Sequence, residues 1–302
     1  MKVISPLNPA YTYVTSTTAT EAADPWVSGT SYAKGDTVTH HTSDGQPDSV
    51  RVWESLVNTN VEEPGTGTQW LDTGPCNRCS MFDQQVSTVT TADTPLVVVI
   101  EPGMINCLAL IGMVGTQLDV TVRDGAGGAI IYQRTHGLII DDIYDWYEYF
   151  FSPSVQQTEV VMTDIPPYST AHMTITLSGA EGSTVACGQC VFGTASDLGD
   201  AGHGVQLSIT DYSRKDTDDY GTTTFVRRAF SARMSLQTLI ENSQLRRLQR
   251  TLAQLRATPA VWIGSEADEY SPTVIYGYYR DFSIDIAYPT HSYCSLEIEG
   301  LA

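Results

Sequence analysis

The chain has 302 residues, and its 16 Lys and Arg against 35 Asp and Glu give a formal net charge of −19 at pH 7. Because proteins that bind nucleic acids neutralise phosphates with clustered basic side chains, this charge argues against a nucleic-acid partner. Charged residues are only 17% of the chain, below the roughly 25% of an average globular protein, so the composition predicts a folded protein and not an acidic disordered one.

Residues 1–24 predict an extended arm, since they hold Pro6, Pro9 and many Ser and Thr without a sustained period. Their apolar start favours docking along a neighbouring subunit over free disorder. The segment has no continuous apolar stretch of the length that a secretory signal needs. The apolar runs at 96–100 and 108–114 are far shorter than the roughly 20 residues of a membrane span. We therefore expect a protein that is made in the cytoplasm and does not insert into a membrane.

Residues 25–75 predict a small β module. Residues 37–40 and 49–55 alternate in strand fashion around the turn-rich segment 42–47, which indicates a hairpin. A module of this size has little core, so large aromatic residues must fill it, whereas any exposed ring offers a flat face to a sugar. The sequence leaves both uses open.

The large aromatic residues of the module and their neighbours follow a pattern: Trp26, Tyr32-x-x-Gly35-Asp36-x-Val38, Val52-Trp53-Glu54, Pro64 and Trp70. In this pattern the module resembles the small chitin-binding carbohydrate modules found beside bacterial chitinases and in many phage tail proteins. The resemblance implies glycan contact through Tyr32, Trp53, Trp26 or Trp70. The chain departs from the family at 58–63, which holds no aromatic ring. The alternatives are that Trp26 and Trp70 fill the core and that the module docks a protein.

Residues 76–200 predict a central antiparallel β-sandwich of the jelly-roll kind. Short strands at intervals of roughly 8 to 15 residues, separated by Gly and Pro, are typical of that architecture. No helical pattern interrupts them. The expected strands are 94–100, 107–111, 118–123, 129–134, 159–163, 171–178 and 184–192.

The segment 141–151 concentrates aromatic rings and carboxylates. A calcium loop needs a glycine to turn the chain, and this segment has none. We expect an edge or interface strand with Tyr147, Tyr149 and Phe151 on one face and Glu148 on the other. A cation or sugar site is the alternative.

Six cysteines include two CxxC pairs, Cys76 with Cys79 and Cys187 with Cys190. Two such pairs could build a four-thiolate zinc site. More than 100 residues separate them, however, whereas compact zinc ribbons space theirs by roughly 15 to 20. A thioredoxin-like use requires a helix after the motif, and 183–192 is strand-like throughout. We favour small buried thiols with one bridge at most, and the sequence leaves open whether these four are free, bridged or metal-bound.

Motifs of catalysis are missing from the sequence. The chain has no G-x-S-x-G elbow, and its six histidines show no HExxH spacing. Its 35 acids offer many carboxylate pairs and so single out none for glycoside hydrolysis. The Gly-rich segment 125–128 lies between two expected strands, which indicates a hairpin turn and not a phosphate loop. We predict no enzyme, no catalytic residue, no cofactor and no metal, with a polysaccharide-degrading enzyme as an alternative.

Residues 205–302 predict an α+β domain with one long helix on an antiparallel sheet. Apolar residues recur at intervals of three and four from 235 to 257, with Pro259 beyond, which predicts the helix. Strands are expected at 220–236, 260–264, 273–279, 282–287 and 293–299.

Basic residues gather in this last part of the chain. Residues 211–302 carry 10 basic and 12 acidic side chains, whereas residues 1–210 carry 6 and 23. One interpretation is a solvated helix face. The other is that these arginines meet an acidic neighbour, such as the acidic half of another copy. The candidates for an assembly interface are Arg227, Arg228, Arg233, Arg246, Arg247 and Arg250.

The C-terminal pattern runs from 211–233 through the helix to 258–265, 276–284 and 294–300. In this order of strand, helix and Trp-containing strand it is similar to structural proteins of tailed bacteriophages, of the minor tail and distal-tail type. The resemblance implies a virion tail component at the tail tip, baseplate or fibre-attachment level, assembled in the host cytoplasm. The partners that it implies are further copies of the chain, other tail, baseplate or fibre proteins, and host surface polysaccharide. A glycan-binding lectin outside a tail is the alternative.

Overall fold

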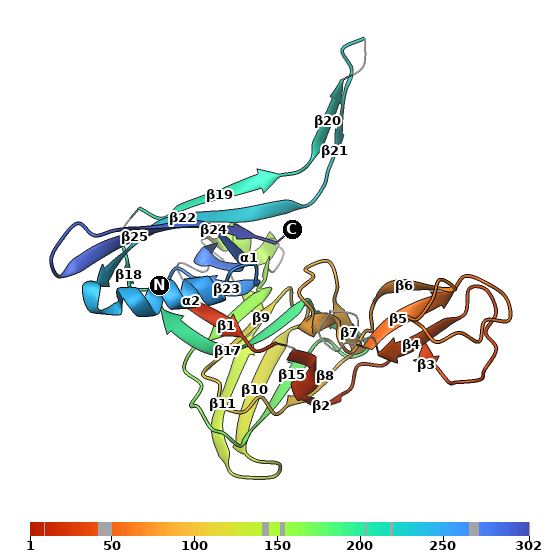
Figure 1. Cartoon of the computed structure of the whole chain (residues 1–302). Helices are drawn as coiled ribbons and strands as arrows, with labels where there is room; N and C mark the ends of the chain where they lie inside the picture. Colours follow the sequence, from red (N-terminus) through yellow and green to blue (C-terminus); the bar gives the residue numbers. More distant parts are fainter. Residues whose placement is uncertain are drawn as a thin grey trace. The chain divides into compact units, whose positions relative to one another are not determined.

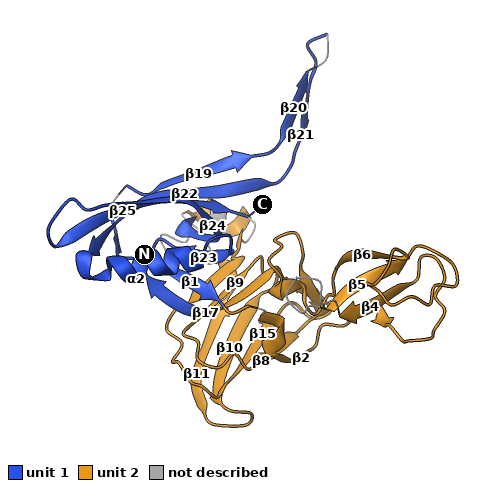
Figure 2. Ribbon diagram, in the orientation of Figure 1, with its two compact units in different colours: residues 1–6, 194–302 blue, residues 7–193 orange. Residues whose placement is uncertain are grey.

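The computed structural model of the chain describes residues 1–8, 10–41, 50–140, 145–151, 155–202, 204–217, 220–265 and 272–301, except for the side chains of Glu148 and Tyr149. Strands make up 53% and helices 9%, so the protein is mainly β, as its sequence predicts. The chain divides into two compact units (Figure 2). Unit 1 comprises residues 1–6 and 194–302, and unit 2 comprises residues 7–193.

The body of unit 2 is a β-sandwich (Figure 1). One sheet has the strand order β11-β10-β15-β8-β2 and the other has the order β14-β9-β17. Two short ribbons, β7 with β16 and β12 with β13, complete it. The bounds are β2 Val14–Thr17, β7 Thr90–Asp93, β8 Leu96–Ile100, β9 Cys107–Ile111, β10 Gln117–Asp124, β11 Ile130–Gly137, β12 Ile139–Ile140, β13 Val155–Gln156, β14 Glu159–Met162, β15 Ala171–Ser178, β16 Thr184–Cys187 and β17 Gln189–Asp197.

Alternation along these strands builds the sandwich core. Successive side chains of a strand point to opposite faces, and every second residue of β8 and β15 is buried. The buried faces share one apolar cluster, in which Val120 and Ile175 of one sheet belong with Leu110 of the other. The predicted sandwich is therefore confirmed. The strand predicted at 184–192 is divided at Gly188, because β16 pairs with β7 and β17 pairs with β9.

Among the described residues of unit 2 there are also three short helices: η1 (Ala10–Tyr13), η2 (Ser80–Phe82) and α1 (Trp146–Phe151). Helix α1 contradicts the strand predicted at 147–151. The rings of Tyr147 and Phe151 lie with their centroids 4.9 Å apart, since residues four apart share one side of a helix. The residues 141–144 of the aromatic segment lie outside the described residues.

The predicted 25–75 module forms a separate four-stranded sheet within unit 2, with the order β3-β4-β5-β6. Its strands are β3 Asp24–Pro25, β4 Thr37–His41, β5 Val50–Ser55 and β6 Trp70–Pro75. The antiparallel pairing of β4 with β5 confirms the predicted hairpin. The turn predicted at 42–47 lies outside the described residues.

Unit 1 is a helix on an antiparallel sheet, as predicted. The sheet has the order β1-β23-β24-β25-β22, and both β18 and β19 pair with β22. On helix α2, Leu248 and Leu252 pack in one cluster with Trp262 of the sheet. The bounds are β1 Lys2–Pro6, β18 Asp200–Ala201, β19 Gln206–Asp211, β20 Arg214–Thr217, β21 Thr223–Val226, β22 Phe230–Glu241, η3 Asn242–Gln244, α2 Leu245–Gln254, β23 Ala260–Ile263, β24 Val274–Asp285 and β25 His291–Gly300.

The helix predicted at 235–257 begins too early. Residues 235–241 belong to β22, where Leu236, Thr238 and Ile240 are buried in alternation. The spacing of the apolar residues also fits a helix. These residues form a strand because they pair with β25 along this stretch. The two strands predicted at 273–279 and 282–287 form one strand, β24, with an irregularity between Tyr279 and Asp281.

The N-terminal segment pairs with strands of its own chain. Strand β1 pairs with β23 in unit 1, and β2 pairs with β8 in unit 2. Val3 and Ile4 of β1 are fully buried. The sequence predicts that residues 1–24 form an extended segment along a neighbouring subunit. The structure differs, because strands β1 and β2 of this segment pair with strands of their own chain.

A close approach of two strands in unit 1 gives the first testable prediction. Gly277 of β24 lies opposite Gly300 of β25, and a Cβ on Gly277 would collide with the backbone carbonyl of Glu299. We expect Gly277→Ala to lower the free energy of unfolding by about 1–3 kcal/mol, measured by urea denaturation. Gly137→Ala in β11 is the control, since its Cβ would meet nothing within 4 Å. Equal losses in both variants would contradict the steric explanation.

Candidate functional site

A two-stranded ribbon continues from β19 and β22 and turns away from the sheet of unit 1 (Figure 1). We call its residues 212–229 the arm. The last pair of the base joins Asp211 to Phe230. The arm then pairs β20 with β21, from Arg214 with Val226 to Thr217 with Thr223.

The arm presents apolar side chains to solvent. Every residue of β20 and β21 is exposed, and Phe225 is 73% and Val226 47% exposed. At the base, Ile209 is 68% exposed. A ribbon of only two strands is marginally stable alone in water, and clustered exposed apolar residues mark interaction surfaces. The arm is therefore the strongest candidate for a surface that binds a partner.

Hydrogen bonds fix the point where the ribbon bends. The carboxylate of Asp211 accepts the backbone N–H of Ser213 at 2.8 Å, and the Ser213 hydroxyl accepts the N–H of Arg228 at 3.0 Å. The N–H of Tyr212 donates to the carbonyl of Ala229 at 3.2 Å. Hydrogen bonds from the Ser213 side chain and backbone lower the pKa of Asp211, because they favour the ionised carboxylate.

This network predicts a pH dependence of the arm. A lowered pKa in the folded protein means that Asp211 stabilises the bend above its ordinary pKa of about 3.9, and that this contribution is lost as the pH falls through the lowered value. We expect the NMR amide signal of Ser213 to titrate with a midpoint below the ordinary value. Asp211→Asn should abolish the titration. A midpoint at or above the ordinary value would contradict the network.

The arginines predicted for an interface fall in three places. Arg227 and Arg228 lie in the arm, directly after β21. Arg246, Arg247 and Arg250 are exposed on α2, whose opposite side contributes Leu248 and Leu252 to the core. Arg233 lies in β22, where its Nη2 donates to Oε1 of Glu299 at 3.1 Å. This bond raises the pKa of Arg233 and gives the residue a partner in its own sheet.

No family model, curated protein or solved structure matches this chain. In the part of the chain that the structure describes, no helix is long and apolar enough to cross a membrane.

The four rings predicted to contact glycan lie in or against the small core of the module. Trp53 and Trp70 are 9% and 5% exposed, and the partly buried Trp26 and Tyr32 pack against them. The indole N–H of Trp70 donates to the carbonyl of Glu62 at 2.8 Å, and the hydroxyl of Tyr32 accepts the N–H of Val27 at 2.9 Å. Trp70 therefore lies in the core of the module, as one of the two interpretations of the sequence expects. Little of the Trp53 ring is accessible to a sugar.

A second exposed aromatic surface lies on helix α1. Trp146, Tyr147, Phe150 and Phe151 are 79%, 70%, 69% and 70% exposed. The flanking ribbon adds Ile139 and Val155, which are also exposed. The sequence signals these residues as an aromatic cluster, and the structure places the cluster on the surface of unit 2.

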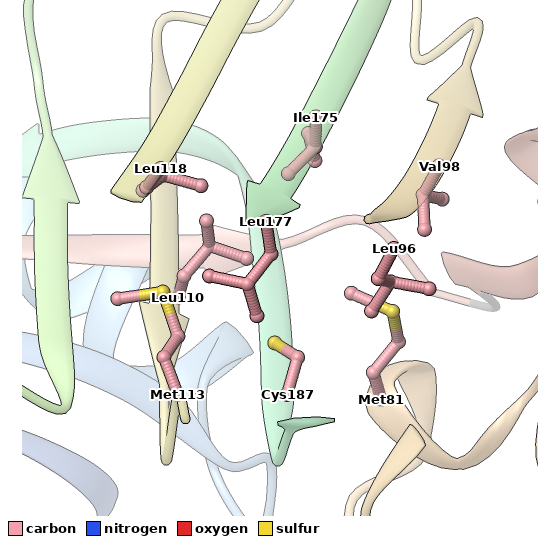
Figure 3. Close-up of a pocket in the computed structure, with 9 residues that line it drawn as sticks. All are labelled: Met81, Leu96, Val98, Leu110, Met113, Leu118, Ile175, Leu177 and Cys187. Carbon is pink, nitrogen blue, oxygen red and sulfur yellow. The ribbon is translucent and has the colours of Figure 1, made fainter. Parts of the chain in front are cut away.

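The interior of the sandwich holds a cavity of about 10 Å³, lined only by apolar and sulfur-containing side chains (Figure 3). Its lining includes Met81, Leu110, Leu177 and Cys187. A water molecule needs about this volume and several polar partners, so the cavity is a packing defect and not a ligand site. Among the described residues, no three His, Cys, Asp or Glu side chains form a cluster that could hold a metal ion.

Proposed function

We propose that the chain is a structural subunit of a bacteriophage tail, at the tail tip, baseplate or fibre-attachment level. It assembles with copies of itself and with other tail proteins, in the host cytoplasm. The arm carries this proposal, because Phe225 and Val226 are exposed on a ribbon that, among the described residues, has two strands and no third. Such a ribbon gains stability when a neighbouring subunit covers it.

The distribution of charge supports assembly between unlike surfaces. Residues 135–213 contain ten acidic side chains and no Lys or Arg. Residues 242–265, which include α2, contain four arginines and no acidic side chain. Complementary charges of this kind set the register of neighbouring subunits and suppress wrong contacts. A chain with both an acidic and a basic segment can bind a second copy head to tail.

The assignment to a phage tail comes from the sequence pattern. The C-terminal order of strand, helix and Trp-containing strand is similar to tail proteins, and the module resembles carbohydrate modules that occur in such proteins. A lectin outside a tail has less support, because the four candidate rings lie in or against the module core. Any contact with host polysaccharide would use other residues or a rearranged ring.

The proposal is tested on the purified full-length chain, alone and mixed with the products of its flanking genes. We expect mass photometry to show oligomers and negative-stain electron microscopy to show rings or stacks. Binding to at least one flanking tail protein is also expected. A chain that stays monomeric and binds none of these proteins would contradict the proposal. Retention on chitin, lost in Tyr32→Ala while β4 and β5 keep their protection from hydrogen exchange, would support the lectin alternative.

A further inference from the structure

The two CxxC segments place the same sequence spacing in two different local structures. Cys76 follows β6, and Cys79 directly precedes the helix η2. Cys187 ends β16, and Cys190 lies in β17. The backbone around the two thiols therefore differs between the pairs, although the spacing of the cysteines is the same.

A turn closes the first motif. The N–H of Cys79 donates to the carbonyl of Cys76 at 2.9 Å, and the N–H of Ser80 donates to the same carbonyl at 3.0 Å. Such a four-residue turn keeps its end Cα atoms within about 7 Å, and a disulfide needs a Cα separation of about 4.4–6.8 Å. The two Sγ atoms are in contact at 2.6 Å. The backbone thus already holds both sulfurs where a bond can form.

Two separate sheets hold the second motif. Cys187 pairs with Thr90 of β7, whereas Cys190 pairs with Leu110 of β9. The thiol of Cys187 contacts the carbonyl of Gln189 at 3.7 Å. Each cysteine of this pair is therefore positioned by its own strand, and the sheets and not a turn determine where the sulfurs lie.

From this contrast we infer that Cys76 and Cys79 form a disulfide, while Cys187 and Cys190 remain thiols. The two thiols of the first pair lose two protons and two electrons as their S–S bond forms. An oxidant of the disulfide class, such as glutathione disulfide, takes them up and becomes two thiols. This inference stands independently of the proposed function.

Burial determines when the bond forms. Cys76 and Cys79 are each 1% exposed. The hydrogen bond between the sulfurs, together with burial, raises the pKa of Cys76, so little of the reactive Cys76 thiolate is present in the folded protein. When the chain refolds in the presence of the oxidant, the bond therefore forms before the turn is covered, and the finished bond is shielded from reductants.

The bond would fix the point where the chain enters and leaves the module. Between the two cysteines, the N–H groups of Asn77 and Arg78 both donate to the carboxylate of Glu21, at 3.0 and 2.6 Å. The Asn77 amide donates to the carbonyls of Thr20 at 2.9 Å and Thr91 at 2.8 Å. The incoming and outgoing segments are thus tied by the two residues that the disulfide would enclose.

The test uses trypsin, which cleaves after Arg78 and so separates the two cysteines. Full-length protein is unfolded, reduced and refolded in a buffer of reduced and oxidised glutathione with a metal chelator. Free thiols are then alkylated under denaturing conditions before digestion. We expect peptides 52–78 and 79–123 to stay linked until reduction, with two of the six alkylation sites lost. The peptide 135–214 should carry both of its cysteines alkylated.

Peptide 79–123 also contains Cys107, so Cys107→Ala is the matched control and should keep the link. Fragmentation of the linked species places the bond in the wild-type chain without any variant. Two separate, fully alkylated peptides would overturn the inference. A link through Cys107, or equal oxidation of Cys187 and Cys190, would overturn it as well.

Discussion

We expect the unmodified chain to self-associate and the Phe225→Asp variant to remain monomeric at the same concentrations. Phe225 is 73% exposed on β21 of the arm. Truncation of a central aromatic residue typically costs an interface about 2 kcal/mol or more, which is roughly a 30-fold weaker association. The introduced carboxylate adds the cost of removing a charge from water. Sedimentation velocity over a concentration series measures the change.

The matched control for this variant is Ile286→Asp. Ile286 follows β24, lies outside the arm and is 68% exposed, so it offers a similar apolar surface at another place. We expect this variant to assemble like the unmodified chain. Near-ultraviolet circular dichroism checks that both variants are folded. If both lost association equally, the arm would have no special role in assembly.

The Trp53→Ala variant is expected to unfold the small module while the rest of the chain stays folded. In the described part of the module, the core contains three buried apolar residues, Val38, Trp53 and Trp70. Removing a buried Trp side chain costs about 3–5 kcal/mol, and a core of this size rarely supplies more than that amount. Hydrogen exchange should show loss of protection in β4 and β5, with β8 and β15 unchanged.

Leu71→Ala is the control for the module, because Leu71 lies on β6 and is 49% exposed. Its effect on stability should stay within about 0.5 kcal/mol. Retained protection of β4 and β5 in Trp53→Ala would show that the module does not depend on this ring. The result also bears on sugar binding, since loss of binding in an unfolded module would not identify a contact residue.

The strands that the sequence predicts best are those with one buried face. Strands β9 and β15 have the predicted bounds, because their apolar residues stop at clear turn residues. The module hairpin follows from the same alternation. The local pattern of apolar and polar residues is enough to predict these elements, and the tertiary contacts stabilise the same strands.

The failed predictions share a physical cause. In β22, Leu236 and Ile240 are four apart and also on one face of a strand, so their spacing fits both structures. Pairing with β25, which is far along the chain, selects the strand. The sequence also does not predict that residues 212–229 form a two-stranded ribbon, for a similar reason. Its residues 223–226 form a strand that is exposed throughout, and only the structure shows that, among the described residues, β20 is the one strand that pairs with it.

The pairing of Lys2 with Ile263 constrains how the chain is made. All the strands of unit 2 from β2 to β16 are complete before the ribosome reaches β23. Strand β1, with Val3 and Ile4 that end fully buried, must therefore wait for this one of its two neighbouring strands until residues 260–263 are made. Its place beside β23 stays open for the β1 of a neighbouring nascent copy, and an exchange of this strand would link two subunits through identical contacts. Translation of several copies close together on one messenger RNA would favour that exchange.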